Sequence, residues 1–228
     1  MKDGPSPAFW AEMNAWRAGY HVVAGLDEVG RGPLAGPVVA AAVVLPHPLP
    51  RALRKAGIRD SKQLSAQGRE RIAPLIREYA VSVAVAYASV EEIDSINILE
   101  ATRLAMCRAV TQLSPRPDLL LTDAVALPHA GVPFQPIVDG DARCLSIASA
   151  SIVAKVFRDA LMVEMDAAYP AYGFAQHKGY GTAEHLAALA RLGPTPEHRR
   201  SFAPVREIGP VLPGHCKVGR STLTFLKP

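Results

Sequence analysis

The chain has 228 residues, of which 49% are hydrophobic and 20% are charged. This apolar content supports one large domain, or a domain with a small appendage, and it excludes a globally disordered chain. Lys and Arg number 25 against 21 Asp and Glu, and the sequence pI is about 9.1. That charge balance permits a nucleic-acid partner without requiring one.

The cysteines and the apolar segments indicate the cellular compartment of the protein. Cys107, Cys144 and Cys216 form no C-x-x-C pair, which argues against a disulfide framework or a zinc knuckle and favours a reducing compartment. Residues 1–20 lack the apolar core of a signal peptide, and the run Val38–Leu45 is too short to span a bilayer. We therefore expect a cytoplasmic protein without a membrane association.

Five segments have the composition of strands. His21–Asp27 is apolar and stops at carboxylates, and Pro37–Leu45 follows a glycine-rich loop. Tyr79–Ser89 alternates and is rich in valine, Asp118–Asp123 is short and apolar, and Phe134–Asp141 is the weakest candidate.

Four helices are expected around these strands. Apolar spacing from Ile72 to Tyr79 predicts the first, which Pro74 should kink or shorten. A capping box of Ser89 and Glu92 opens the second, which should run to about Leu113. The third covers residues 146–169, and the fourth runs from an N-cap at Thr182 to a stop at Gly193-Pro194. The apolar faces should consist of Ile96, Leu99, Met106, Val110 and Leu113 in the second helix and Val153, Val156, Ala160 and Val163 in the third.

This order of elements indicates a mixed α/β sheet covered by helices. We divide the chain into an N-terminal segment over residues 1–20, a core over 21–170 and a C-terminal helical and irregular extension over 171–228. The part after about Ser201 is rich in Gly and Pro and should be irregular.

Acidic residues end three of the predicted strands: Asp27 with Glu28, then Asp123, then Asp139 or Asp141. Ligands gather outside the carboxyl ends of strands in open α/β sheets, and converging carboxylates repel one another unless a cation neutralises them. Oxygen ligands alone suit Mg²⁺ or Mn²⁺, and two such ions can clamp a phosphodiester. The alternative, that these acids are turn residues or helix caps, stays open on spacing alone.

The first acidic pair and the following loop carry their own constraints. Adjacent strand residues point to opposite faces, so either the strand ends between Asp27 and Glu28 or Glu28 contributes through water or its carbonyl. Gly30, Gly32 and Gly36 do not form a dinucleotide motif, because prolines and a strand follow instead of a helix. The loop instead offers closely approachable backbone, with Arg31 available for a phosphate.

Six blocks in order carry a family resemblance: "GLDEVGRGPLAGPVVAAAVVL", "RDSKQLS", "EEIDSINILEATRLAM", "IASASIVAKVFRDALM", "YGFAQHKGYGT" and "HRRSF". Over roughly Val22 to Pro204, the chain resembles bacterial ribonuclease HII, a type 2 ribonuclease H. The resemblance implies an RNase H-like fold, a mixed five-stranded sheet flanked by helices with a small helical C-terminal extension. It also implies endonucleolytic cleavage of RNA in RNA–DNA hybrids and incision 5′ to single ribonucleotides in DNA, giving 3′-hydroxyl and 5′-phosphate ends.

The same resemblance assigns catalysis and the binding of two Mg²⁺ or Mn²⁺ ions to Asp27, Glu28, Asp123 and Asp141. Asp159 competes with Asp141 but lies eighteen residues away, about 27 Å if all of that were helix, so both cannot serve one metal pair. Lys155 at i−4 explains Asp159 as an ion-pair partner, and we choose Asp141. The chain departs from the family at Ala124, where Gly is usual, and at Asp139, where a basic residue is usual.

For the substrate, the resemblance implies that the backbone of Gly30, Arg31 and Gly32 reads the 2′-hydroxyl and that Tyr180 stacks under the sugar after the ribonucleotide. A Tyr that fills a loop core is the alternative for Tyr180. Four basic residues are candidate phosphate contacts, although solvated surface charges explain them as well: Lys62, Lys178, Arg199 and Arg200.

Two other functions compete with this one. One is a non-catalytic hybrid-binding protein whose metal site has decayed, and the other is an exonuclease or phosphatase on the same fold. We expect a monomer that binds RNA–DNA hybrids or DNA duplexes containing ribonucleotides. A DNA sliding clamp, recruited by the terminal "STLTFLKP", is a further candidate partner.

Overall fold

The computed structural model of this chain describes residues 9–208. Cys216 and the terminal "STLTFLKP" lie outside the described residues. Within residues 9–208, no helix is both long and apolar enough to cross a bilayer.

A five-stranded mixed sheet with the order β3-β2-β1-β4-β5 forms the centre of the fold. The first three strands, β1 (Val23–Val29), β2 (Val38–Val44) and β3 (Ser82–Ala88), pair antiparallel. Strand β4 (Leu119–Asp123) pairs parallel with β1, and β5 (Phe134–Ile137) pairs parallel with β4. All five predicted strands are present, but β5 stops before Asp139 and Asp141.

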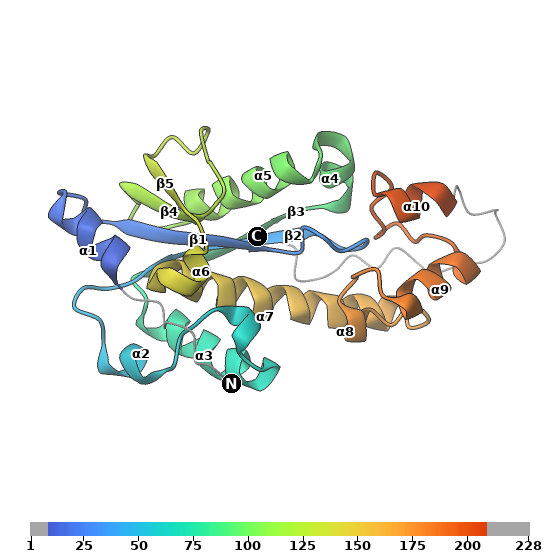
Figure 1. Cartoon of the computed structure of the whole chain (residues 1–228), viewed down its shortest axis with the longest axis horizontal. Helices are drawn as coiled ribbons and strands as arrows, with labels where there is room; N and C mark the ends of the chain where they lie inside the picture. Colours follow the sequence, from blue (N-terminus) through green and yellow to red (C-terminus); the bar gives the residue numbers. More distant parts are fainter. Residues whose placement is uncertain (1–8, 209–228) are drawn as a thin grey trace.

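Helices cover both faces of the sheet (Figure 1). On one face lie α4 (Val90–Ile96) and α5 (Ile98–Thr111), and on the other lie α2 (Arg51–Lys55), α3 (Ala66–Tyr79) and α7 (Leu145–Ala168). A hydrophobic core lies on each face of the sheet, and strand β2 contributes side chains to both because successive side chains of a strand point to opposite faces. Its even-numbered residues from Val38 join the core beneath α5, and its odd-numbered residues from Val39 pack against α3 and α7.

The second predicted helix is two helices, which corrects the expectation of one continuous helix to Leu113. The Ser89–Glu92 capping box opens α4 as expected. Asn97 then takes a left-handed φ of 71°, and its side chain accepts hydrogen bonds from the first turn of α5. Ile96 and Leu99 flank this break and are exposed, whereas the predicted Met106, Val110 and Leu113 are buried.

Two more helix expectations need correction. Helix α3 continues through Pro74 to Tyr79 and is not shortened, while the kink at Pro74 stays a prediction. In α7, Val153 is buried, but Ala160 and Val163 are exposed and Val156 is only half-buried. The far half of α7 leaves the sheet and packs against the C-terminal extension, so a different face is buried there: Arg158, Leu161, Met162 and Met165.

The C-terminal extension contains α8 (Phe174–His177), α9 (Ala183–Leu192) and α10 (Ala203–Ile208) at one end of α7 (Figure 1). Helix α9 starts at the Thr182 N-cap and ends at Gly193, as predicted. Helix α10 corrects the expectation of irregular structure after Ser201. A short antiparallel bridge between Ala35 and His198 joins the extension to the loop that follows β1.

The remaining helices are α1 (Trp10–Arg17), a 3₁₀ helix (Ser61–Gln63) and α6 (Gly140–Arg143). Helix α6 follows β5 and leads through Cys144 into α7. Asp141 therefore lies in a short helix and not at a strand end.

Candidate active site

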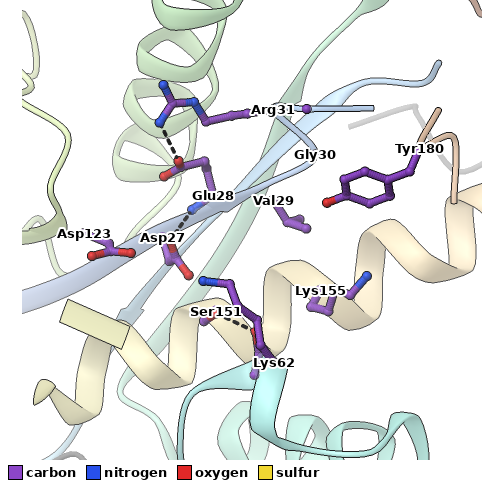
Figure 2. A pocket seen from close by; sticks show the side chains of 12 residues that line it. Asp27, Glu28, Val29, Gly30, Arg31, Lys62, Asp123, Ser151, Lys155 and Tyr180 are labelled. Atoms are coloured by element: carbon purple, nitrogen blue, oxygen red, sulfur yellow. Dashed lines mark hydrogen bonds and ion pairs between the residues drawn. The ribbon is translucent and has the colours of Figure 1, made fainter. Parts of the chain in front are cut away.

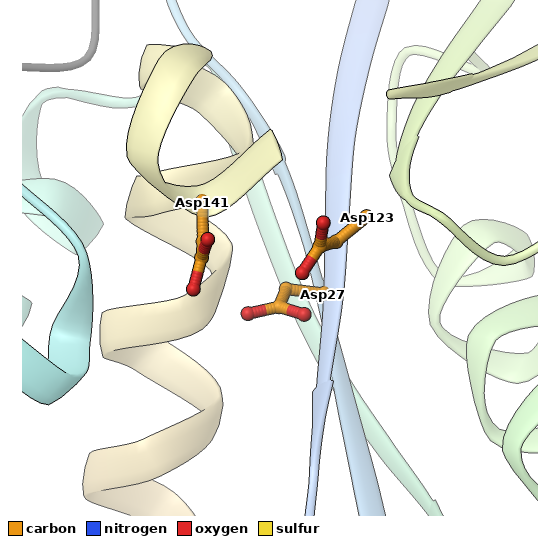
Figure 3. Close-up of side chains that lie close together, drawn as sticks. All are labelled: Asp27, Asp123 and Asp141. Carbon is orange, nitrogen blue, oxygen red and sulfur yellow. The ribbon is translucent and has the colours of Figure 1, made fainter. Parts of the chain in front are cut away.

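Three carboxylates meet at one edge of the sheet (Figure 3). Asp27 lies near the end of β1, Asp123 is the last residue of β4, and Asp141 lies in α6. Ligand oxygens of the three lie within 4.8 Å of one another. The parallel pairing of β1 with β4 brings the first two together, and the amide of Gly140 donates to Oδ1 of Asp123 at 2.9 Å, which holds α6 against β4.

Glu28 does not join this group of three. Strand β1 continues to Val29, so it does not end between the two acids, and Glu28 points away from Asp27. Its Oε1 accepts a hydrogen bond from Nη1 of Arg31 at 3.2 Å. Its Oε2 is buried without a hydrogen-bond partner, although Glu28 still lines the same cleft as Asp27.

The acids carry negative charge that the chain only partly offsets. Burial, and then the neighbouring Glu28, raise the pKa of Asp27 well above its usual range, while a hydrogen bond from Ser151 opposes the shift. Burial also raises the pKa of Asp123 and of Glu28. Two cations pair with the acids: Nζ of the exposed Lys62 lies 3.2 Å from Oδ2 of Asp141, and Nη1 of Arg31 lies 3.2 Å from Oε1 of Glu28.

This donor set fits a hard divalent cation. All ligand atoms are carboxylate oxygens, which Mg²⁺ and Mn²⁺ prefer. The raised pKa values and the unpartnered oxygen of Glu28 show buried negative charge that a bound cation would neutralise.

Two other acids that the sequence left open lie outside the group. Asp159 pairs with Nζ of Lys155 at 2.7 Å and with Nη2 of Arg69 at 3.6 Å. Asp139 is exposed in a left-handed conformation immediately before α6, and its charge contributes a little to the raised pKa of Asp123. Ala124, which follows Asp123, also has a left-handed φ of 54°.

An open cleft connects the acids to the glycine loop and Tyr180 (Figure 2). Its lining residues come from β1, the following loop, the 3₁₀ helix, β4, α7 and the extension: Asp27, Glu28, Val29, Gly30, Arg31, Gly32, Ser61, Lys62, Asp123, Ser151, Lys155 and Tyr180.

Sequence reasoning missed Ser61, Ser151 and Lys155 as cleft residues. The hydroxyls of Ser61 and Ser151 lie 2.8 Å apart, which ties the 3₁₀ helix to α7. Ser151 and Lys155 are four residues apart, so they share one face of α7. For Ser151 and Lys155, this i, i+4 spacing of two polar residues was the available sequence signal.

The glycine loop and Tyr180 form two facing walls of the cleft. Gly30 has a φ of 92°, and a Cβ there would lie 2.1 Å from Nε of Arg158, so the position requires glycine. A Cβ on Gly32 would lie 3.8 Å from a ring carbon of Tyr180, which places these two residues across a narrow gap. Tyr180 is 44% exposed, so the alternative that it fills a loop core is wrong.

The four basic residues occupy different environments. Lys62 is exposed at the acids, and Arg200 is exposed on the extension. Lys178 is half-buried, and its Nζ donates to the carbonyl of Ala175. Arg199 is fully buried, which contradicts the expectation of a surface charge, because its guanidinium donates to carbonyls of the glycine loop.

Comparisons with known proteins identify the family. Residues 24–205 match the family model for ribonuclease HII. The chain is 54% identical to ribonuclease HII of Desulfitobacterium hafniense over 196 residues, covering 86% of this chain and 74% of that protein. It is 56% identical to ribonuclease HII of Rhodospirillum rubrum over 206 residues, covering 89% and 94%.

Solved structures are similar at the level of the fold. Ribonuclease H2 from Pyrococcus horikoshii superposes with a TM-score of 0.71 at 25% identity, covering 82% of this chain and 97% of that chain. The structure of a PCNA:RNase HII complex from Archaeoglobus fulgidus gives a TM-score of 0.67 at 25% identity, covering 81% and 96%.

Proposed function

The chain belongs to the ribonuclease HII family, a family of metal-dependent endoribonucleases, and we propose that it cleaves RNA in RNA–DNA hybrids and incises DNA 5′ to single embedded ribonucleotides. The products carry 3′-hydroxyl and 5′-phosphate ends. One observation carries the proposal: Asp27 and Asp123 line the same cleft as Gly30–Gly32 and Tyr180, and a carboxylate oxygen of Asp141 lies within 4.8 Å of theirs.

Asp27, Asp123 and Asp141 are the residues that would hold Mg²⁺ or Mn²⁺, with Glu28 as the fourth acid of a two-ion site. Bound ions of this kind supply an activated water and stabilise the leaving oxygen. Glu28 is held in place by its backbone amide, which donates to Oδ1 of Asp27 at 2.8 Å. Lys62 offsets part of the acidic charge and is exposed enough to contact a substrate phosphate.

Discrimination between ribose and deoxyribose falls to the loop of Gly30, Arg31 and Gly32. A 2′-hydroxyl both donates and accepts hydrogen bonds, so exposed backbone groups can recognise it without a side chain. The missing Cβ of Gly32 leaves room for a sugar beside the ring of Tyr180. Tyr180 then stacks under the sugar that follows the ribonucleotide, which marks the RNA-to-DNA junction.

Contacts to substrate phosphates are assigned to Lys62, Arg31, Lys178 and Arg200, of which all but Lys178 are exposed. We propose that the protein acts as a cytoplasmic monomer. The relative from Archaeoglobus fulgidus was solved with PCNA, and we propose a sliding clamp as a partner of this chain as well.

A labelled DNA duplex with one ribonucleotide, incubated with Mg²⁺ or Mn²⁺, tests the function. Internal incision on the 5′ side of the ribonucleotide is the expected result. Retention of the duplex without cutting would favour a binding protein with a decayed metal site, and shortening from the ends would favour an exonuclease.

A further inference from the structure

Two fully buried arginines lie behind the glycine loop. Arg158 comes from α7 and Arg199 from the extension, and both side chains are 0% exposed. Among residues 9–208, neither guanidinium forms an ion pair with an acid. Buried charges in proteins are usually paired, so two neighbouring cations without a carboxylate need another explanation.

Arg199 holds the loop from residue 30 to residue 36. Its Nη2 donates to the carbonyls of Gly30 at 2.6 Å and Gly36 at 2.8 Å. Its Nη1 donates to the carbonyl of Arg31 at 2.9 Å, and its Nε donates to Gly36 at 2.9 Å. The loop that faces the substrate is therefore fixed from behind at both of its ends.

Arg158 joins that loop to the segment of Tyr180. Its Nε and Nη2 donate to the carbonyls of Pro37 at 3.2 Å and Ala35 at 3.1 Å. Its Nη1 donates to the carbonyl of Lys178 at 3.0 Å, two residues before Tyr180. A single side chain thus bridges the two walls of the cleft.

Backbone hydrogen bonds run beside this bridge. The amide of Leu34 donates to the carbonyl of Gly179 at 2.7 Å, and the amide of Gly36 donates to the main-chain carbonyl of Glu197 at 2.8 Å. These bonds span the same junction between the loop and the extension. Planar guanidinium groups suit such a junction because one group can donate to several fixed carbonyls at once, which lysine cannot do.

We propose that Arg158 and Arg199 are positioning residues that fix the distance between the Gly30–Gly32 backbone and the Tyr180 ring, and thereby set the preference for a lone ribonucleotide over continuous RNA. This proposal rests on the proposed function and adds its specificity determinant. A lone ribonucleotide offers one productive register, in which the 2′-hydroxyl and the following sugar must fit both walls together. Continuous RNA offers many registers, so it tolerates an error in the spacing.

The test compares Arg158→Lys, Arg199→Lys and Arg108→Lys with the unchanged chain. Arg108 is the matched control, because it also donates to a carbonyl, that of Tyr87, and pairs with Glu92 away from the cleft. Each protein is assayed for kcat/KM on a duplex with one ribonucleotide and on a continuous RNA–DNA hybrid. Amide hydrogen exchange at Leu34 and Gly36 is measured without substrate.

We expect the ratio of the two kcat/KM values, single ribonucleotide over continuous RNA, to fall about tenfold or more in both cleft variants, since a misplacement of about 1 Å can cost about 100-fold in rate. Amide exchange at Leu34 and Gly36 should accelerate in these variants, while Arg108→Lys should change neither the kcat/KM ratio nor this exchange.

An unchanged kcat/KM ratio, with or without a loss of activity on both substrates, would overturn the proposal. So would failure of both cleft variants to fold, because the arginines would then be structural only. If the unchanged chain cuts neither substrate, the proposed function fails, and unchanged exchange at the two amides would separately refute the bridge.

Discussion

Two buried charge clusters lie at the end of β1, one of acids and one of arginines. They differ in sign and in how far the chain itself supplies their hydrogen-bond partners. On one side, Asp27, Asp123 and Asp141 bring three carboxylates within 4.8 Å. On the other, Arg158 and Arg199 are fully buried beneath the glycine loop. Within residues 9–208, every hydrogen bond of the two guanidinium groups ends on a main-chain carbonyl.

The comparison separates charge that completes the fold from charge that needs an external ligand. Burial lowers the pKa of Arg158 to about 10 and, together with the charge of Arg158, that of Arg199 to about 9, so both stay protonated at neutral pH. Asp27, Glu28 and Asp123 instead have pKa values that burial raises, and Oε2 of Glu28 is buried without a hydrogen-bond partner. Neutralising a group should therefore have opposite effects in the two clusters.

The largest expected effect is on the acidic side. Asp27→Asn and Asp141→Asn should each reduce cleavage by about 10³-fold or more, because losing a metal ligand removes several kcal/mol of transition-state stabilisation. Their melting temperatures without metal should equal or exceed that of the unchanged chain, because the repulsion among the acids is relieved. Cleavage assays and thermal unfolding of the same preparations measure both quantities.

Asp159→Asn is the control for the choice of ligands, since Asp159 pairs with Lys155 and Arg69 instead of joining the acids. It should retain most cleavage activity. Full activity in Asp141→Asn together with inactivity in Asp159→Asn would reverse our choice of Asp141 over Asp159 as the last of the four acids.

The next effect is on the arginine side and concerns stability. Arg199→Met should lower the free energy of unfolding by about 3 kcal/mol or more, because the carbonyls of Gly30, Arg31 and Gly36 lose their donors in a buried site. Arg108→Met should cost about 1 kcal/mol or less, since that ion pair with Glu92 is partly exposed. Urea unfolding without metal compares the two, and equal losses would show that burial of Arg199 adds nothing.

The same contrast shows how far the sequence predicts the molecule. Local patterns predicted the five strands, the Ser89–Glu92 capping box and the Thr182 N-cap, because each depends on residues close in the chain. The break at Asn97 was missed, since apolar residues continue at helical spacing across it while one left-handed residue redirects the chain. The exposed Val163 was misassigned because the partner of α7 changes from the sheet to the extension.

At the site, the acids could be predicted and the arginines could not. Asp27 and Asp123 belong to apolar strands that a sequence pattern reveals, and their convergence follows from the parallel pairing of β1 with β4. The sequence suggested no role for Arg158, and Arg199 was expected to contact a substrate phosphate or to be a solvated surface charge. Their burial depends on carbonyls more than a hundred residues away in the chain, at Ala35 and Gly36, which no local pattern encodes.

A smaller effect concerns the histidines packed behind Tyr180. His198 is fully buried, and its Nε2 lies 3.0 Å from Nε2 of His185. Burial, followed by the nearby His185 and Arg200, lowers the pKa of His198 to about 3. The folded protein therefore keeps this ring neutral, while the unfolded chain protonates it near pH 6.5. Stability is fully present above about pH 6.5 and falls as the pH drops toward 3, by at most about 1.4 kcal/mol per pH unit from this group.

Urea unfolding between about pH 7 and pH 5 should show a steeper loss of stability in the unchanged chain than in His198→Asn. Asn retains an acceptor for the amide of Thr195, which His198 now binds at 3.0 Å. Replacing the exposed His129 by Asn is the control and should leave the slope unchanged. Identical dependence of unfolding free energy on pH in the unchanged chain and in His198→Asn would mean that His198 takes up a proton in the folded protein. The region around Arg158 and Arg199 would then accommodate a further positive charge.

The smallest effect tests whether the acidic side also carries backbone strain. On the arginine side, the left-handed position next to the cluster is a glycine, Gly30 with a φ of 92°, whereas on the acidic side it is Ala124 with a φ of 54°. A left-handed conformation costs a residue with a Cβ about 1–2 kcal/mol, and glycine loses about 0.5–1 kcal/mol through the greater entropy of the unfolded chain. Ala124→Gly should therefore raise the free energy of unfolding by about 0.5–1 kcal/mol. Ala126→Gly, two residues on and without a positive φ, should lower it by a similar amount.

The activity of Ala124→Gly is measured as well, since Asp123 directly precedes Ala124. A stabilised and equally active Ala124→Gly would show that the backbone strain at Ala124 is incidental. A stabilised but slower enzyme would show that this strain helps to hold Asp123 in position.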